Sequence, residues 1–262
     1  MKEYVRLIYR NASYVTLPTE GAIGIFEDMS KKLPMPIEAV SNGIDLQHFK
    51  PGDAPKSLYT RFNLPKDRPI VIYVGRLDAE KHISTLVKAF THVLEKHNAH
   101  LLIVGHGNDS DRLQELARNN GIVSDTTFTG FVSEEDKELL YQLGTVYCMT
   151  SPAELQCISM LEAMACGLPV VSVDAGPLKE LCQDGRNGYL CKLDDDVDMA
   201  TKISKVLDDD QRRQKMGIES LAIATTHDLR YTLDRFEAIY AQVHASPRRP
   251  RRRLAALLVR KR

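Results

Sequence analysis

The sequence lacks three features that define a protein's location by themselves. Its five cysteines form no C-x-x-C pair, its longest apolar runs fall far short of a membrane span, and no segment has the pattern of a secretory signal peptide. An odd number of cysteines scattered over apolar segments is typical of buried thiols in a reducing compartment. We therefore expect a cytoplasmic protein, either soluble or peripheral to the inner face of a membrane.

Net charge is also absent, because the chain holds 35 basic and 35 acidic residues. The charges are unevenly placed: residues 248–262 hold eight Arg or Lys and no acid, which leaves 27 basic against 35 acidic residues in 1–247. Only this tail is a candidate for anionic partners. It encloses the apolar run 254–259, which favours shallow insertion at an anionic membrane surface. A disordered solubilising tail is the alternative, and nucleic acid is not expected because the body is acidic.

Apolar segments alternate with helical ones from Pro69 onward. The expected strands are 70–74, 101–104, 126–129, 146–149 and 170–173, and the expected helices include 82–96, 109–119 and 133–143. These strands are apolar throughout, which is typical of a parallel sheet covered by helices on both faces. We therefore predict an α/β fold with a Rossmann-like, doubly wound parallel sheet. With 262 residues, 43% of them hydrophobic, the chain can bury a large core.

The two ends of the chain differ from this regular part. Residues 1–40 contain a short strand, a helical stretch and a second short strand, which cannot bury their own faces. Residues 41–52 are rich in turn formers and suit a hinge. Residues 227–244 are expected to form an amphipathic helix, with one apolar stripe of Leu229, Leu233, Phe236, Tyr240 and Val243.

The stretch 150–171 carries two carboxylates in unusual surroundings. Glu162 lies in an expected helix whose neighbouring residues are all apolar or small. A buried carboxylate without partners costs several kcal/mol, so Glu162 needs partners, either backbone amides or a bound polyol such as a ribose. Glu154 lies just before the start of this helix, where free N–H groups form a natural anion site. Together the two carboxylates suggest a sugar nucleotide as the ligand.

Two loops follow expected strands at the edge where open α/β sheets bind ligands. The first contains Gly75, Arg76 and Lys81, whose cations can hold a phosphate, although ordinary surface charge is the alternative. The second contains Gly105 and Gly107, where the missing side chains let a backbone approach a ligand, although a plain tight turn is the alternative. The third glycine of a dinucleotide fingerprint is absent, so no NAD site is predicted.

Two aspartate triplets, 194–196 and 208–210, resemble D-x-D metal sites. Both lie where helices are expected to begin, and N-capping explains aspartates at such positions. No motif pairs Cys157 with a base, so it is not predicted to be a nucleophile. We therefore expect neither a metal nor another cofactor.

Taken together, the motifs resemble the donor half of retaining glycosyltransferases of the GT-B fold, family-4 type, also called glycosyl transferases group 1. The resemblance covers roughly residues 14–244. It rests on G-R-L-x-x-E-K, G-x-G, G-F-V before S-E-E-D, the linker-like N-G-I-D-x-x-x-F-x-P, and E-x7-E running into E-A-M-A-C-G-L-P-V-V. It implies a closing fragment of an acceptor domain (1–40), a linker (41–52), a Rossmann-like donor-binding domain (53–226), a crossover helix (227–245) and a basic tail (246–262).

The same resemblance implies roles for individual residues. Arg76 and Lys81 would hold the donor diphosphate, Glu162 the ribose, and Glu154 the hydroxyls of the transferred sugar, which makes Glu154, Arg76 and Lys81 the catalytic set. The rest of the expected donor-binding set is Gly75, Gly105, Gly107, Leu155, Gln156, Cys157 and Glu162, with the main-chain amides of 155–157 against the diphosphate. The implied function is metal-independent transfer of a sugar from a nucleoside diphosphate sugar to an acceptor, with retention of configuration. A lipid-linked molecule is a candidate acceptor.

The chain departs from the family pattern in two places. Leu155, Gln156 and Cys157 stand where many members have Gly-x-Gly, and His82 replaces a frequent Gly or Asn. Because the family's first domain supplies the acceptor pocket, we expect this chain alone to be incomplete and weakly active or inactive. The alternatives are a non-catalytic remnant that binds nucleotide sugars, and a membrane or nucleic-acid adaptor that reuses half of a GT-B fold.

Overall fold

The computed structural model describes residues 9, 12–30 and 35–245. The basic tail, residues 246–262, lies outside the described residues, so its predicted membrane role stays a prediction. Within the described ranges, no helix combines the length and the apolar character that crossing a membrane requires.

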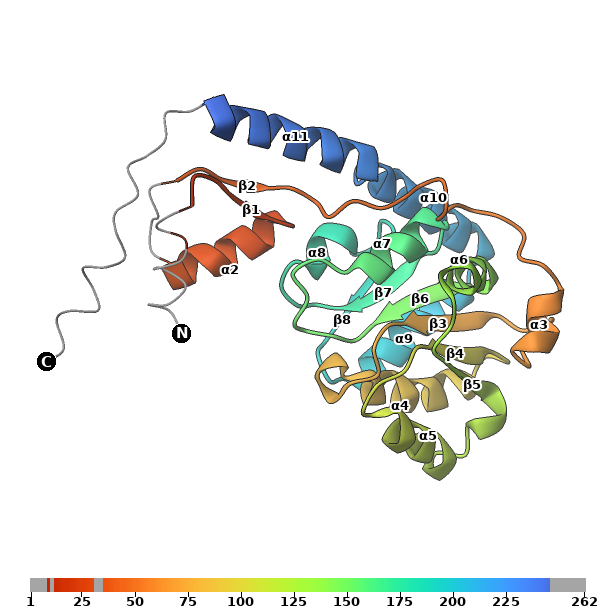
Figure 1. Ribbon diagram of the computed structural model, residues 1–262. Coiled ribbons are helices and arrows are strands. Elements are labelled where there is room, and N and C mark those ends of the chain that lie inside the picture. The colour runs from red at the N-terminus through yellow and green to blue at the C-terminus, as the bar shows by residue number, and fades with distance from the viewer. Residues whose placement is uncertain (1–8, 10–11, 31–34, 246–262) are drawn as a thin grey trace, which may run out of the picture.

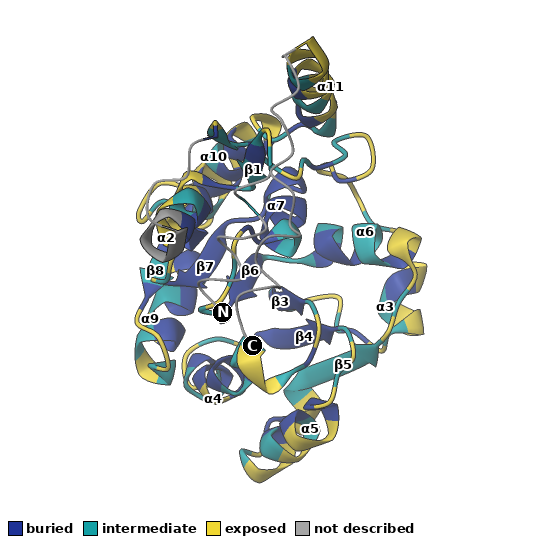
Figure 2. Cartoon of the chain, turned by 60° about the vertical axis from the view of Figure 1, so that its left-hand side comes forward, coloured by how far each residue is buried: buried dark blue, intermediate teal, exposed yellow. Residues whose placement is uncertain are grey.

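A six-stranded parallel sheet forms the centre of the molecule (Figure 1). Its strands are β3 (Ile70–Val74), β4 (His100–Val104), β5 (Thr126–Gly130), β6 (Val146–Met149), β7 (Val170–Val173) and β8 (Gly188–Cys191), in the order β5-β4-β3-β6-β7-β8. Strands β3, β4, β6 and β7 are buried along their whole length (Figure 2). Burial on both faces explains why their sequences are continuous apolar runs. The predicted Rossmann-like sheet is confirmed.

Helices cover both faces of this sheet. α4 (Ile83–Leu94), α5 (Ser110–Asn119) and α9 (Asp196–Leu207) lie on one face, and α6 (Glu134–Leu143) and α7 (Ile158–Ala165) on the other (Figure 1). α10 (Asp210–Thr225) packs against α7. The shorter elements are α3 (Ser57–Arg61), α8 (Leu178–Leu181) and the 3₁₀ turns η1 (Ala79–Lys81) and η2 (Val123–Asp125). α3 and the 3₁₀ turns were not expected, because such short elements show no amphipathic period.

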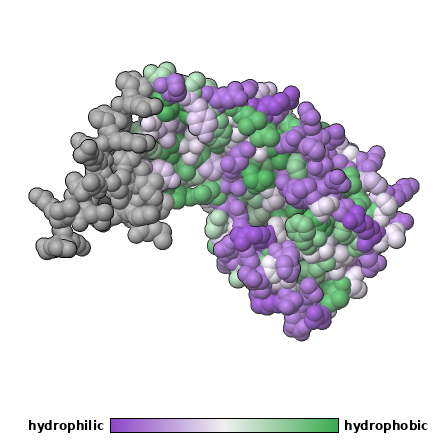
Figure 3. Space-filling model, in the orientation of Figure 1, coloured by the Kyte–Doolittle hydropathy of each residue, from purple (hydrophilic) through white to green (hydrophobic). Residues whose placement is uncertain are grey.

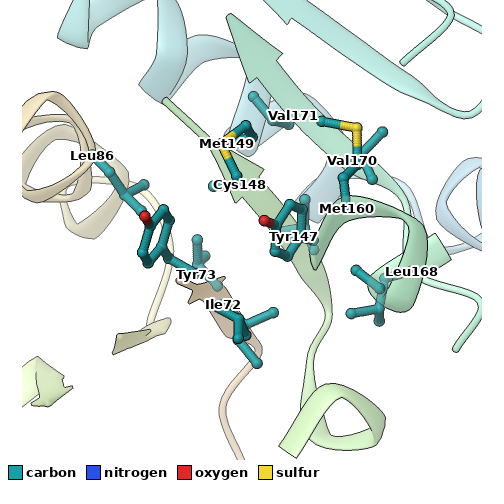
Figure 4. Close-up of a cluster of buried hydrophobic side chains, with 14 of the residues drawn as sticks. Ile72, Tyr73, Leu86, Tyr147, Cys148, Met149, Met160, Leu168, Val170 and Val171 are labelled. Atoms are coloured by element: carbon teal, nitrogen blue, oxygen red, sulfur yellow. The ribbon is translucent and has the colours of Figure 1, made fainter. Parts of the chain in front are cut away.

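Large aromatic side chains fill the core beneath the carboxyl ends of the central strands. Tyr73 of β3 lies beside Leu86 of α4, and Tyr147 of β6 lies on the side of Met160 of α7 (Figure 4). The hydroxyl of Tyr147 is 2.8 Å from Oγ of Ser159 in the first turn of α7. The beginning of α7 therefore rests on a close-packed layer that restricts its movement.

Three helices begin at side chains that accept a hydrogen bond from the main chain. Ser133 accepts from the amide of Asp136 at 3.1 Å, Asp195 accepts from Asp198 at 2.8 Å, and Asp209 accepts from Arg212 at 2.9 Å. Such caps typically stabilise a helix by about 1 kcal/mol. The capping role expected of both aspartate triplets is confirmed. Among the described residues, no three His, Cys, Asp or Glu side chains gather in a way that could hold a metal ion.

The N-terminal elements form a small separate sheet. Strands β1 (Val15–Leu17) and β2 (Ile37–Ala39) pair in parallel and are connected through α2 (Glu20–Ser30). α11 (Leu229–Ala245) reaches this sheet through Arg235, which forms a bidentate pair with Glu38 of β2. Hydrogen bonds from Arg235 and from the Tyr14 hydroxyl lower the pKa of Glu38 to about 2. The contact between α11 and the small N-terminal sheet is therefore partly electrostatic.

The apolar stripe expected on α11 is only partly covered. Leu229, Phe236 and Val243 are half-buried, whereas Leu233 and Tyr240 are exposed. On the face that Figure 3 presents, hydrophobic residues are interspersed with hydrophilic ones.

The boundaries assigned to the domains from the sequence stay predictions.

We expect the cysteines of the folded protein to be almost unreactive at pH 8. All five are free and buried, and burial raises the pKa of Cys157 to about 11 and of Cys166 and Cys191 to about 12. Because the thiolate is the reactive form, a chromogenic disulfide reagent should label the native protein slowly and all five thiols rapidly in denaturant. Fast labelling of any cysteine in the native state would contradict this packing.

Stability should fall as the pH drops from 6.5 to 4 because of His100. This residue of β4 is buried, its Nε2 is 2.9 Å from Thr127 Oγ1, and burial together with nearby Arg68 lowers its pKa to about 4. An unfolded histidine titrates near about 6.5, so the unfolded state takes up the proton first and gains stability as pH falls. Urea unfolding at pH 7 and pH 4.5 should show a smaller pH-dependent loss for His100→Gln than for the wild type. Equal losses would exclude His100 as the source.

Candidate functional site

The order of strands reverses between β3 and β6. From β3 the chain proceeds to β4 and β5 on one side, and from β6 to β7 and β8 on the other. The loop after β3 leads to α4 on one face of the sheet and the loop after β6 leads to α7 on the other. Ligands of open α/β sheets bind at such a switch point. Most of the predicted site residues lie in these loops, 75–81 and 150–157, whereas Gly105 and Gly107 follow β4 and Glu162 lies in α7.

Lys81 and Glu154 meet at this switch point. Lys81 Nζ is 2.6 Å from Glu154 Oε1, and the two side chains are 18% and 15% exposed. The main-chain carbonyl of Lys81 also accepts a hydrogen bond from Thr150 Oγ1 at 2.6 Å, which joins the two loops a second time. The structure therefore places an ammonium and a carboxylate side by side, where a ligand with phosphate and hydroxyl groups could use both.

Arg76 is held by acids of its own loop. Its guanidinium pairs with Asp78 and, at 2.9 Å, with Glu80, and its side chain is 66% exposed. Exposed pairs of this kind typically contribute at most about 1 kcal/mol, so a phosphate could replace them at low cost. The phosphate role of Arg76 stays a prediction.

Gly105 and Gly107 have a structural role. A Cβ at Gly105 would lie 2.0 Å from the carbonyl oxygen of Gly75, and one at Gly107 would lie 2.4 Å from that of Leu77. Main-chain hydrogen bonds hold the two loops at this distance, from Gly75 to Val104 at 3.0 Å and from Leu77 to His106 at 3.1 Å. Close contact between two loops therefore requires glycine here, and ligand contact by these glycines stays a prediction.

Glu162 is buried and has two side-chain partners. Its Oε1 is 2.9 Å from Lys137 Nζ, and its Oε2 accepts a hydrogen bond from the Tyr141 hydroxyl at 2.7 Å. Lys137 also pairs with Glu134 at 2.7 Å and lies 5.3 Å from the ring centroid of Phe49. The sequence had suggested backbone amides or a polyol as the partners of Glu162; in the structure an ammonium and a phenol occupy these positions. The ribose contact of Glu162 stays a prediction.

The side chains of Gln156 and Cys157 are occupied within the protein. The amide of Gln156 bonds to residues 41 and 42, and the Cys157 thiol lies 3.5 Å from Ser159 Oγ. The Leu155 side chain is half exposed, and its carbonyl accepts a hydrogen bond from Thr19 Oγ1 at 2.9 Å. A ligand at this loop would therefore meet main-chain groups and Leu155, and the main-chain role of 155–157 stays a prediction.

Four residues of the site were missed from the sequence. Lys137 and Tyr141 lie one helical turn apart on α6, so they share a face and could have been proposed as partners for Glu162. Thr19 and Thr150 gave no signal, because they bond to residues 136 and 69 positions away. A single threonine carries no information about such a partner.

The fold is a Rossmann-like α/β fold with a charged pair at its switch point. The family model for glycosyl transferases group 1 matches residues 58–220, more than half of the chain. The chain therefore belongs to this family, and the resemblance inferred from its motifs is confirmed.

Curated relatives agree with this assignment. Alpha-D-kanosaminyltransferase of Streptomyces kanamyceticus is 29% identical over 241 residues, which is 89% of this chain and 61% of that protein. An uncharacterized glycosyltransferase of Methanocaldococcus jannaschii is 35% identical over 143 residues, which is 55% of this chain and 37% of that protein. The chain spans less than two thirds of either relative.

Solved structures share the fold. Sucrose-phosphate synthase from Thermosynechococcus elongatus superposes with a TM-score of 0.84 at 25% identity, over 94% of this chain and 62% of that one. HepE of Anabaena, solved in complex with UDP and glucose, superposes with a TM-score of 0.80 at 21% identity, over 92% of this chain and 67% of that one. These likenesses confirm the expected GT-B architecture.

Gly107→Ala should destabilise the protein. The new Cβ would meet main-chain atoms of Leu77, which cannot yield as a flexible side chain would, so we expect a loss of about 1–3 kcal/mol in the free energy of unfolding, measured in urea. Gly24→Ala is the control, because its Cβ would meet nothing within 4 Å and alanine favours the helix. Similar stability of both variants would show that the loops separate easily.

Proposed function

We propose that this chain is the donor-binding half of a retaining glycosyltransferase, which transfers a sugar from a nucleoside diphosphate sugar to an acceptor. The observation that carries the proposal is the Lys81–Glu154 pair at the switch point of a chain from the glycosyl transferases group 1 family. The complex of HepE with UDP and glucose supports the ligand class. Relatives named alpha-D-kanosaminyltransferase and D-inositol 3-phosphate glycosyltransferase support the reaction class.

Binding of the diphosphate would rearrange the charged groups of the site. A phosphate that replaces Glu154 as the partner of Lys81 would pair with a partly buried cation. Arg76 would provide a second cation if its pairs with Asp78 and Glu80 break. As the glycosidic bond breaks, negative charge grows on the leaving diphosphate, and cations placed in advance favour that state. Main-chain amides at the start of α7 act in the same direction. These groups supply the charge stabilisation without a metal.

The two carboxylates would then hold hydroxyl groups. Released from Lys81, Glu154 can accept hydrogen bonds from the transferred sugar. Glu162 keeps Lys137 and Tyr141, and each of its oxygens still has a lone pair for a ribose hydroxyl. The two carboxylates would therefore bind different parts of one donor molecule, Glu154 the transferred sugar and Glu162 the ribose.

The acceptor and the cellular place belong to the same proposal. A lipid-linked acceptor would fit a chain whose residues 248–262 carry eight cations, because each basic residue near an anionic membrane contributes roughly 1 kcal/mol to binding. The enzyme would then act in the cytoplasm at the inner face of a membrane, with an acceptor-binding domain as its further partner.

Calorimetric titration of uridine, guanosine and adenosine diphosphate sugars, with and without EDTA, tests the proposal. Lys81→Met should weaken binding by about 1.5–3 kcal/mol, the value of a charged hydrogen bond. Glu162→Gln should weaken the nucleoside diphosphate and its sugar conjugate alike, and Glu154→Gln only the conjugate.

Lys88→Met is the control, because Lys88 is an exposed residue of α4. If EDTA abolishes binding while Lys81→Met leaves it unchanged, the site has been assigned wrongly. Equal losses for both ligands in both glutamate variants would remove the division of roles between the carboxylates.

A further inference from the structure

Three parts of the chain meet at Ser41. The side-chain amide of Gln156, only 8% exposed, donates from Nε2 to Ser41 Oγ at 2.8 Å and accepts from the Asn42 amide at 2.8 Å. Ser41 Oγ also accepts from the Gly43 amide at 3.1 Å and lies 2.9 Å from Nδ1 of His227. The loop after β6, the linker 41–52 and the segment between α10 and α11 are thereby joined.

The hydrogen-bonding capacity of Ser41 determines the direction of each bond. A hydroxyl accepts two hydrogen bonds and donates one, and Gln156 and Gly43 use both acceptor positions. The proton of Ser41 is therefore left for Nδ1 of His227, which must be neutral with its own proton on Nε2. Burial lowers the pKa of His227, which agrees with a neutral ring. Every bond in the network then has a donor and an acceptor, and such a network holds one arrangement.

The same place joins the N-terminal elements to the sheet. The main chain of Ile44 donates to His227 at 2.8 Å and accepts from Leu229 at 2.9 Å, so the linker pairs with the segment that enters α11. Figure 1 shows the chain after β2 running beside α11 toward α10. α11 in turn holds β2 through Arg235 and Glu38. Residues 41–44 of the linker and 227–229 before α11 therefore form one contact region, here called the crossing. Gln156 is attached to it through Ser41 and Asn42.

Gln156 lies two residues after Glu154, in a loop whose neighbouring carbonyl, that of Leu155, is held by Thr19 of the N-terminal elements. We propose that Gln156 is a positioning residue that sets the place of Glu154 relative to Lys81 by fastening this loop to the crossing. A displacement of the N-terminal elements is transmitted through Gln156 to the carboxylate that contacts the transferred sugar. This inference rests on the proposed donor-binding function for its effect on affinity.

The chain offers a matched control. Gln142 of α6 also fastens the linker, donating from Nε2 to the carbonyl of Lys50 at 3.3 Å, and it belongs to a different element from the loop of Glu154. Gln156→Met and Gln142→Met both remove a side-chain amide that holds the linker while keeping a similar side-chain size. Only the first should change the loop.

Hydrogen exchange of the full chain tests the coupling without any ligand. In Gln156→Met, peptides covering residues 150–158 should exchange about 3- to 10-fold faster than in the wild type, as expected for lost hydrogen bonds that restrain a local opening. In Gln142→Met they should exchange at the wild-type rate. Unchanged exchange in Gln156→Met, or an equal increase in both variants, would overturn the inference.

Calorimetry tests the consequence for the site. Gln156→Met should weaken a nucleoside diphosphate sugar about 3- to 10-fold and the nucleoside diphosphate alone by less, because both ligands meet the main-chain amides of the loop but only the sugar meets Glu154. Ser41→Ala removes the other end of the same bond and should have the same effect, so it decides the matter if Gln156→Met does not fold. Unchanged affinity, or equal loss for both ligands, would overturn the positioning role. If the wild type binds no nucleotide sugar, the proposed function fails while hydrogen exchange still decides the coupling.

Discussion

The ion pair between Lys81 and Glu154 is the interaction on which the candidate site depends. The residues are 73 positions apart and come within 2.6 Å because the strand order reverses between β3 and β6. Both side chains are mostly buried, so each charge compensates the other. Removing one of them leaves the other as an unpaired, partly buried charge, which is destabilising. A ligand that separates them must offer an anion to Lys81 and hydrogen-bond donors to Glu154. Phosphate and sugar hydroxyl groups offer this combination.

Groups that need not touch a ligand hold this pair and its surroundings in place. Gly105 and Gly107 let the main chains of two neighbouring loops come into contact, which sets the position of the loop that leads to Lys81. Lys137 and Tyr141 hold Glu162 in an otherwise apolar environment, and Phe49 of the linker packs against both. The linker therefore contacts the supports of Glu162 as well as the loop of Glu154.

Polar contacts join the N-terminal elements and the linker to the main body and to α11. Glu38 pairs with Arg235, Thr19 bonds to Leu155, and Gln156 bonds to Ser41. The buried apolar residues of the N-terminal elements form no part of the large hydrophobic core around the central sheet. Polar contacts can be exchanged for water at a small net cost, whereas separating two apolar surfaces is much more costly. This difference in cost is the physical basis of the coupling proposed between the N-terminal elements and the loop of Glu154.

The sequence alone determined the sheet, most helices, the helix caps and the family. Apolar runs, helical periods and capping residues act over a few positions, so they can be read from neighbouring residues. Only the tertiary structure decided that Glu162 is held by Lys137 and Tyr141, and that Gln156 bonds to Ser41, 115 positions away. These contacts depend on which loops the strand order brings together and on where each side chain points. Neither property is contained in a local pattern of residues.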